Sequence, residues 1–212
     1  MDLPALQAEL RKRTREPFTP WGQKQSNRWD ALTNFIYHTP TWDELKIEVA
    51  RRRPAGVDAD RFFNYAANRW FNFWSAWGVE RIFCELDGVQ AATNPRDRLV
   101  DFTLHGIRFD HKTSVFPRRF PHSLSDAQQH PGLLIGWLYH NQSREGRMHF
   151  GNRLFIVLYH SKTGEHWKLR AELLWLKGKI EAYVRHFRPE RLVSLQLGDG
   201  RVALSDIIWG VW

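Results

Sequence analysis

Apolar and polar positions alternate along two short runs near the middle of the chain, and this alternation predicts a β-hairpin. The runs are VDFTL, residues 100–104, and IRFD, residues 107–110. In each of them every second residue is apolar, as in strands that are buried on one face. Only His105 and Gly106 separate the runs, which suits a tight turn in which glycine adopts a positive φ. We therefore expect Leu104 to pair with Ile107.

The same kind of pattern predicts the other elements. Helical spacing of apolar residues indicates helices over 3–13, over 58–86 with a break or kink at Gly78, and over 163–187. The stretch 123–143 is also expected to be largely helical. Thr41 and Glu44 have the spacing of a capping box that opens a helix through about Arg52. Strands are expected at 89–92, 154–159, 192–197 and 202–204, and the apolar end 207–212 should be docked or at an oligomer contact. These elements predict an α/β domain over 58–212, preceded by a basic helical N-terminal arm over 1–57.

The hairpin register carries the chemical hypothesis. Counting outward from the turn sets Asp101 opposite Asp110, and Cβ atoms of directly opposed residues lie about 4.5–5.5 Å apart. Two carboxylates at that distance repel each other, so a cation is expected between them. Oxygen ligands suit Mg²⁺ or Mn²⁺ rather than zinc. Lys112 falls on the same face as Asp110, where its charge can stabilise a phosphate.

These residues resemble a known family. Asp101 followed by Asp110-His111-Lys112 is similar to the D…(D/E)xK signature of the PD-(D/E)xK nuclease superfamily, although Val100 stands where that signature has proline. The resemblance covers about residues 78–115 and implies a restriction-endonuclease-like mixed sheet flanked by helices. It implies that Asp101, Asp110 and the main-chain carbonyl of His111 bind the metal and that Lys112 acts in catalysis. The superfamily often adds a glutamate from the preceding helix, here Glu80, with Glu85 as the competing residue.

Other interpretations of these residues remain open at this point. An acidic and basic triplet on an exposed hairpin is also typical of an ordinary solvated face with an ion pair across the strands. Either glutamate of the helix could serve in a surface ion pair. The aromatic stripe within 62–77 is typical of a core or a dimer contact, and less so of a base-stacking platform.

Charge and composition favour a polyanionic partner. The formal net charge of the 212 residues is +8 and the isoelectric point is about 9.9, as in many proteins that bind nucleic acid. Arg51, Arg52 and Arg53 form one basic cluster, and Arg118 and Arg119 form another just after the hairpin. Both clusters are expected to contact phosphates, although a solvated basic face is the plainer interpretation.

The sequence disfavours several classes of protein and of binding site. Cys84 is the only cysteine, which excludes an internal disulfide framework and a cysteine-based zinc cluster. No run of 18 apolar residues and no apolar leader segment occurs, so we expect no membrane partner and a cytoplasmic protein. The sequence has no glycine-rich phosphate loop followed by lysine and no GxSxG elbow.

Together these observations predict a Mg²⁺-dependent endonuclease that hydrolyses DNA, with Mn²⁺ able to substitute. Restriction, phage defence and mobile-element functions all fit that activity. Because one active site cuts one strand, cleavage of both strands would favour a homodimer. The alternatives are a non-catalytic nucleic-acid-binding subunit on the same fold, and a nuclease for RNA or branched DNA.

Overall fold

The computed structural model describes residues 1–16, 24–92, 99–141, 151–197 and 200–212. Its contacts divide the chain into two units. The helical unit comprises Met1–Val79 and Ala171–Leu174, and the sheet unit comprises Glu80–Arg170 and Trp175–Trp212. This division differs from the expected boundary at residue 57, because residues 59–79 pack with the N-terminal helices.

The helical unit is built from α1 (Leu3–Arg15), α2 (Asn27–Leu32), the 3₁₀ helix η1 (Asn34–His38), α3 (Trp42–Arg52) and most of α4 (Ala59–Cys84). The expected cap of α3 is confirmed, since the Glu44 N–H donates to Thr41 Oγ1 at 3.3 Å. The aromatic stripe of α4 lies in the core, where Trp70 is fully buried and donates its indole N–H to the Thr39 carbonyl at 2.7 Å. The polar tip of the ring is thereby satisfied while its apolar body is removed from water.

A break or a kink was expected at Gly78, and the break is wrong, because α4 runs without interruption through this residue. A Cβ atom at position 78 would lie 2.7 Å from Leu173 Cδ1 and 3.1 Å from Leu6 Cδ2. The glycine therefore allows close packing inside the helical unit and does not end the helix.

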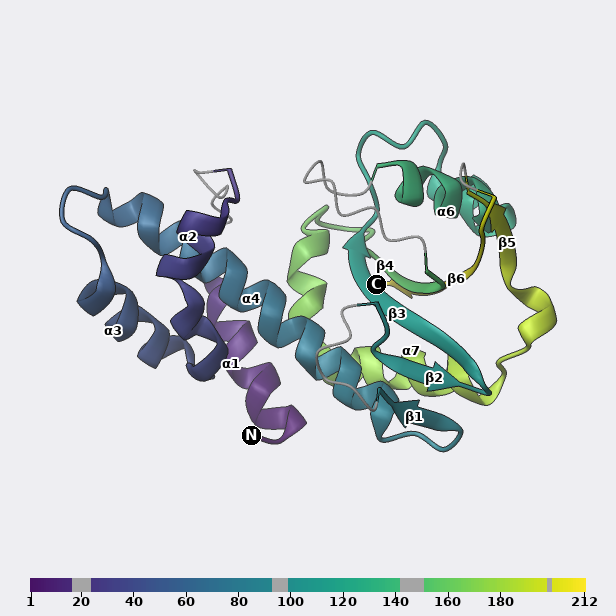
Figure 1. Ribbon diagram of the computed structural model, residues 1–212, viewed down its shortest axis with the longest axis horizontal. Helices are drawn as coiled ribbons and strands as arrows, with labels where there is room; N and C mark the ends of the chain where they lie inside the picture. The colour runs from purple at the N-terminus through teal and green to yellow at the C-terminus, as the bar shows by residue number, and fades with distance from the viewer. Residues whose placement is uncertain (17–23, 93–98, 142–150, 198–199) are drawn as a thin grey trace. The chain divides into compact units, whose positions relative to one another are not determined.

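The sheet unit contains a six-stranded mixed sheet in the order β1-β2-β3-β4-β6-β5 (Figure 1). The strands are β1 (Val89–Ala91), β2 (Phe102–Leu104), β3 (Ile107–Val115), β4 (Arg153–Tyr159), β5 (Val193–Gln196) and β6 (Val202–Val211). Strand β4 pairs in parallel with both β3 and β6, and the other pairs are antiparallel. The apolar C-terminal segment is thus docked, as part of the strand β6 that lies beside β4.

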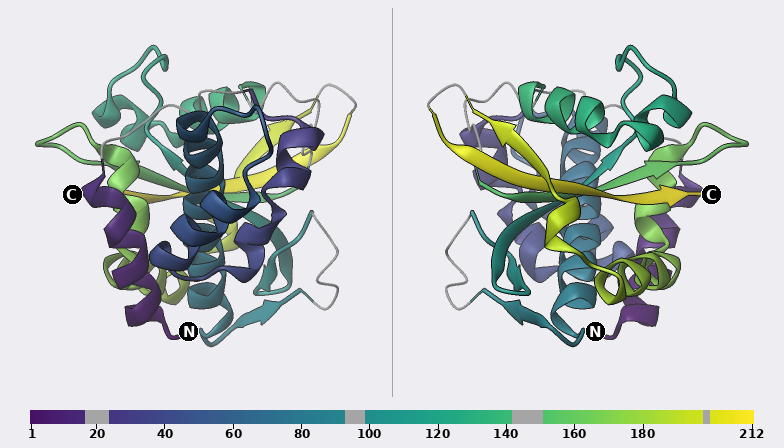
Figure 2. Two further views of the ribbon diagram at one scale, coloured as in Figure 1. Left: turned by 90° about the vertical axis from the view of Figure 1, so that its left-hand side faces the viewer. Right: turned by 90° about the vertical axis from the view of Figure 1, so that its right-hand side faces the viewer.

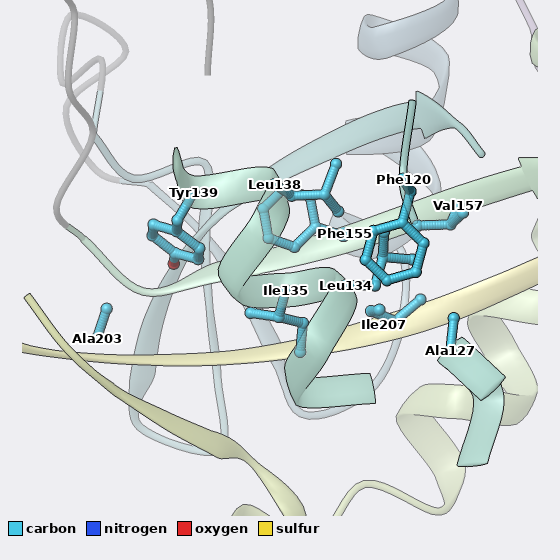
Figure 3. Close-up of a cluster of buried hydrophobic side chains, with 10 residues drawn as sticks. All are labelled: Phe120, Ala127, Leu134, Ile135, Leu138, Tyr139, Phe155, Val157, Ala203 and Ile207. Atoms are coloured by element: carbon cyan, nitrogen blue, oxygen red, sulfur yellow. The ribbon is translucent and has the colours of Figure 1, made fainter. Parts of the chain in front are cut away.

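Helices flank the sheet on both faces, with α6 on one side of β6 and α7 on the other (Figure 2). One face is covered by α5 (Leu124–Gln129) and α6 (Pro131–His140), and α7 (Leu173–Arg185) follows the 3₁₀ helix η2 (His166–Ala171). Side chains of α6 and of the strands form a buried cluster (Figure 3) that contains Leu134, Ile135, Phe155, Val157 and Ile207. On the other face, the Phe187 ring that follows α7 contacts Phe109 with centroids 6.3 Å apart.

Two expectations about this part of the chain need correction. The helical stretch 163–187 is divided into η2 and α7. The helix-rich stretch 123–143 is likewise divided into two helices, α5, which starts from a capping box of Ser123 and Asp126, and α6. Within the described residues, no helix is long and apolar enough to cross a membrane.

Candidate functional site

The hairpin of β2 and β3 has the expected register from the turn as far as the Phe102–Phe109 pair. Phe102 pairs with Phe109 and Leu104 with Ile107, and both turn residues have positive φ, 47° at His105 and 81° at Gly106. A two-residue turn with two positive φ angles matches the right-handed twist of the strands. The turn therefore holds the register that places Asp110 and Lys112 on the same strand face.

Asp101 lies just beyond this ladder, which ends at the Phe102–Phe109 pair. Its N–H donates to the Phe109 carbonyl at 2.8 Å, and its carboxylate Oδ2 accepts from the His111 N–H at 2.8 Å. The Asp101 carboxylate thus accepts a hydrogen bond from β3 that a backbone carbonyl of β2 would accept if the ladder continued. The expected direct opposition of Asp101 and Asp110 is therefore not part of the described ladder, because a side chain replaces the next pairing.

Asp101 and His111 form a buried pair. Asp101 Oδ2 lies 2.7 Å from His111 Nδ1, and the imidazole packs beside the stacked pair of the Phe83 and Phe102 rings, at centroid distances of 6.1 and 6.3 Å. Burial alone would lower the pKa of His111, but the hydrogen bond to Asp101 and the negative charge of Asp101 outweigh burial and raise it. Burial likewise opposes the charge of Asp101, but the His111 contact prevails and lowers the pKa of Asp101.

Asp110 has a different partner, the buried Arg153 at the start of β4. The two residues are in register across the parallel pair, and Arg153 Nε donates to Asp110 Oδ2 at 2.5 Å while Nη2 contacts the same oxygen. Burial raises the pKa of Asp110, the charge of Arg153 lowers it, and the charge of Asp101 raises it, so that the net direction is upward. Asp101 is therefore close enough to act on Asp110, although their carboxylates have separate partners.

Glu80 and Glu85 differ in their burial and in their partners. Glu80 is half-buried, and its pKa is raised first by burial and then by the charge of Asp101. Its carboxylate makes no hydrogen bond or ion pair with the described residues. Glu85 is exposed and pairs with Arg81 at 3.1 Å. Of the two helix carboxylates, Glu80 is the one whose surroundings include Asp101 and His111.

Lys112 is the exposed cation of the site. Its ammonium makes no ion pair or hydrogen bond with the part of the chain that the structure describes. Although the side chain keeps contact with solvent, desolvation lowers the pKa of Lys112; the charge of Arg153 adds to this effect, and Asp110 opposes it. The ammonium is thus available to an anion that reaches this face.

One of the two basic clusters expected to contact phosphates, Arg51, Arg52 and Arg53, belongs to the helical unit. Arg51 and Arg52 pair with Glu48 at 2.7 and 2.5 Å, and Arg53 donates to the Val57 carbonyl at 2.5 Å. A cavity of about 820 Å³ in the helical unit is lined in part by Arg52 and Glu48. These arginines therefore have protein partners, and they belong to a different unit from the carboxylates discussed above.

Arg118 and Arg119 lie in a turn after β3 and are exposed. The positive charge of Arg118 contributes to lowering the pKa of His166, after burial. Neither side chain forms an ion pair with another described residue. Both side chains are accessible to solvent, and their contact with phosphate stays a prediction.

Arg153 is the residue that sequence analysis missed. Its partner is 43 positions away, and the register of a parallel pair cannot be deduced from either strand alone. One signal was available, because a charged residue at the start of the apolar strand RLFIVLY needs a partner if it is buried.

Comparison of the chain with protein-family models, with curated proteins and with solved structures gives no match. Among the described residues, no three histidine, cysteine, aspartate or glutamate side chains stand together as a group able to hold a metal ion. The case for a function therefore rests on the geometry and charge around the β2–β3 hairpin.

Proposed function

We propose that the protein is a Mg²⁺-dependent nuclease that hydrolyses phosphodiester bonds of DNA. The observation that carries the proposal is electrostatic: Asp101, which precedes β2, acts on both Glu80 of α4 and Asp110 of β3, although the three described acids do not stand together as a ready-made metal-binding group. Lys112, which has no ion-pair or hydrogen-bond partner among the described residues, stands two residues from Asp110 on β3. This is the residue set that the D…(D/E)xK signature implies.

The donor set fits Mg²⁺ in its chemistry. The Glu80 carboxylate has no partner among the described residues, and only the Oδ2 atoms of Asp101 and Asp110 are engaged. Hard oxygen donors of this kind, with the His111 carbonyl, are those that Mg²⁺ and Mn²⁺ prefer. When bound, the ion polarises the phosphoryl group and acidifies the attacking water.

The chain's own residues supply the remaining functions. Lys112 orients the attacking water and stabilises the negative charge that grows on the phosphate, since an ammonium in a partly desolvated site interacts strongly with such charge. His111, held by Asp101 and by the aromatic rings, fixes the position of the strand carbonyl at residue 111. Loss of one such electrostatic group costs roughly 10²–10³ in rate.

The test is cleavage of plasmid, linear and branched DNA and of RNA, with Mg²⁺ or with EDTA. Asp110→Asn and Lys112→Gln should each reduce cleavage by roughly 10²-fold or more. Glu85→Gln is the matched control, because it removes a carboxylate from the same helix end without touching Asp101. Cleavage that persists in EDTA or in Asp110→Asn would refute the proposal.

The products also report on assembly. A single site cuts one strand at a time, so a monomer should accumulate nicked plasmid before linear plasmid. Linear product that forms directly, with a rate rising as the square of protein concentration, would indicate the homodimer.

A non-catalytic nucleic-acid-binding subunit is the second candidate. It is favoured by one observation: His111 Nδ1 already pairs with the Asp101 carboxylate, and Arg153 already pairs with that of Asp110, so each acid has a partner within the protein. DNA binding without cleavage under Mg²⁺ or Mn²⁺ would select this function over the nuclease.

A further inference from the structure

Arg153 is an unusual residue for its position. It begins a strand whose following five residues are buried and apolar, and only 2% of its own surface is exposed. Nε and Nη2 donate to Asp110, but Nη1 is buried without an acceptor among the described residues. A buried donor left unsatisfied costs about 1–3 kcal/mol. Such an atom calls for an acceptor that the described chain does not supply.

The guanidinium is held firmly. Its carbon lies 6.0 Å from the centre of the Tyr139 ring and 5.8 Å from that of Phe155, and the Tyr139 hydroxyl donates to the Gly151 carbonyl at 2.9 Å. With Asp110 on a further side, Arg153 has little freedom to turn. Aromatic walls also exclude water, so the charge of Arg153 is poorly screened.

Positive charge exceeds negative charge around Lys112. The charged groups within electrostatic range of its ammonium include Arg153, Arg170 and Asp110. Arg170 donates from Nη2 to the Thr113 carbonyl at 2.9 Å, so it is anchored to the same strand. Burial lowers the pKa of Arg170 to about 10, which leaves it charged at neutral pH. Among the described residues, Lys112, Arg153 and Arg170 thus stand against the Asp110 carboxylate.

We propose that Lys112 and Arg153 form an anion subsite that binds one phosphodiester group of a nucleic acid. The exposed Lys112 meets the phosphate first, and Nη1 of Arg153 supplies a fixed second donor behind it. Asp110 orients Arg153, and Arg170 adds charge without direct contact. That the anion is nucleic acid rests on the proposed function, whereas the subsite itself requires no metal.

The test measures binding in EDTA, so that cleavage plays no part. Fluorescence anisotropy of a labelled DNA duplex is compared for the wild type, Lys112→Gln, the charge-balanced double variant Arg153→Gln/Asp110→Asn, and Lys177→Gln. The last is the matched control, because Lys177 is a cation of the sheet unit that pairs with Glu181 at 3.8 Å. Circular dichroism checks that each variant is folded.

Lys112→Gln and the double variant should each weaken binding roughly ten- to hundredfold, the range for one charge-assisted hydrogen bond, and Lys177→Gln less than about twofold. Combining Lys112→Gln with the double variant should cost less than the product of the two effects, because both cations serve one phosphate. Wild-type affinity in folded Lys112→Gln would overturn the inference even if cleavage is observed. Multiplicative effects would also overturn it, because they show two separate phosphates.

A final experiment distinguishes a phosphodiester of DNA from free phosphate as the bound anion. Titration with inorganic phosphate, at ionic strength matched with chloride, should displace the duplex only at millimolar concentration. If phosphate alone binds at Lys112 and the duplex does not, the subsite is for a free anion and the inference is wrong. Subsite-dependent duplex binding by a protein that cleaves nothing would refute the nuclease and leave the subsite standing.

Discussion

The Glu80 carboxylate is half-buried, has no partner among the described residues, and faces the charge of Asp101. Burial and that charge raise its pKa above the usual range of a glutamate, so the ionised form destabilises the folded state. The unfolded chain loses this proton near pH 4.3, and the folded protein loses it at higher pH. Stability from this group is therefore greatest below about pH 4.3 and falls as the pH rises through the folded pKa.

Glu80→Gln should accordingly separate stability from metal binding. Without metal, the variant should be more stable than the wild type at pH 7, by a few tenths of a kcal/mol after allowance for solvent screening, and equally stable near pH 3. It should also bind Mn²⁺ at least tenfold more weakly, as measured by electron paramagnetic resonance of the free ion. Glu85→Gln serves as the control for both measurements. Unchanged Mn²⁺ affinity in Glu80→Gln would exclude Glu80 from the metal site.

At the level of single residues, the sequence could predict the hairpin register around Asp110 and Lys112, but not the partners of the two acids. The alternation around the turn fixes which residues share a face, because the side-chain period of a strand is two. It does not say where pairing stops, and pairing stops at Phe102 because the Asp101 carboxylate binds the His111 N–H. Arg153 is joined to Asp110 only by the parallel pairing of β3 and β4, which depends on the whole sheet.

At the level of elements, β6 shows how a strand can be recognised in part. The sequence suggested a short strand at 202–204 and a separate docked end, whereas one strand spans Val202–Val211. Gly210 lies inside it, opposite Leu158 of β4. Glycine usually weakens a strand interior and often marks a close approach. Here a Cβ atom would lie 2.6 Å from Leu158 Cδ2 and 3.3 Å from the Trp175 ring.

Gly210→Ala should therefore destabilise the protein by overpacking. Leu158 is fully buried, so it cannot move aside into solvent, and forcing an extra methyl group into such a core costs about 1–3 kcal/mol. For a chain of this size, that corresponds to a fall in Tm of roughly 2–4 °C per kcal/mol.

Gly178→Ala is the matched control, because Gly178 lies within α7 and an added Cβ there meets nothing within 4 Å. It should stabilise the protein by about 0.5–1 kcal/mol, since alanine favours the helix. Differential scanning calorimetry measures both variants. An unchanged Tm in Gly210→Ala would mean that Leu158 and Trp175 adjust without cost.

For the whole molecule, the formal net charge of +8 makes a prediction that neither single residues nor elements supply. Many cations already have acidic partners, as Arg51 and Arg52 do in Glu48. The excess is therefore carried by cations that have no acidic partner among the described residues, such as Lys112, Arg118 and Arg119. If several of these cations contact the phosphates of DNA, binding releases counterions. The logarithm of the association constant then falls linearly with the logarithm of the salt concentration, with a slope of about −0.9 for each phosphate contacted.

We expect duplex binding in EDTA to be independent of the DNA sequence and to weaken steeply between 50 and 200 mM salt. Lys112→Gln should reduce the magnitude of the salt-dependence slope by roughly 0.9 if one phosphate contact is lost. Arg118→Gln/Arg119→Gln should reduce it by up to about twice as much. Anisotropy titrations at several salt concentrations measure each slope, with Lys177→Gln as the control. A slope near zero in the wild type would mean that the excess charge does not face DNA, and the polyanionic partner would then have to be abandoned.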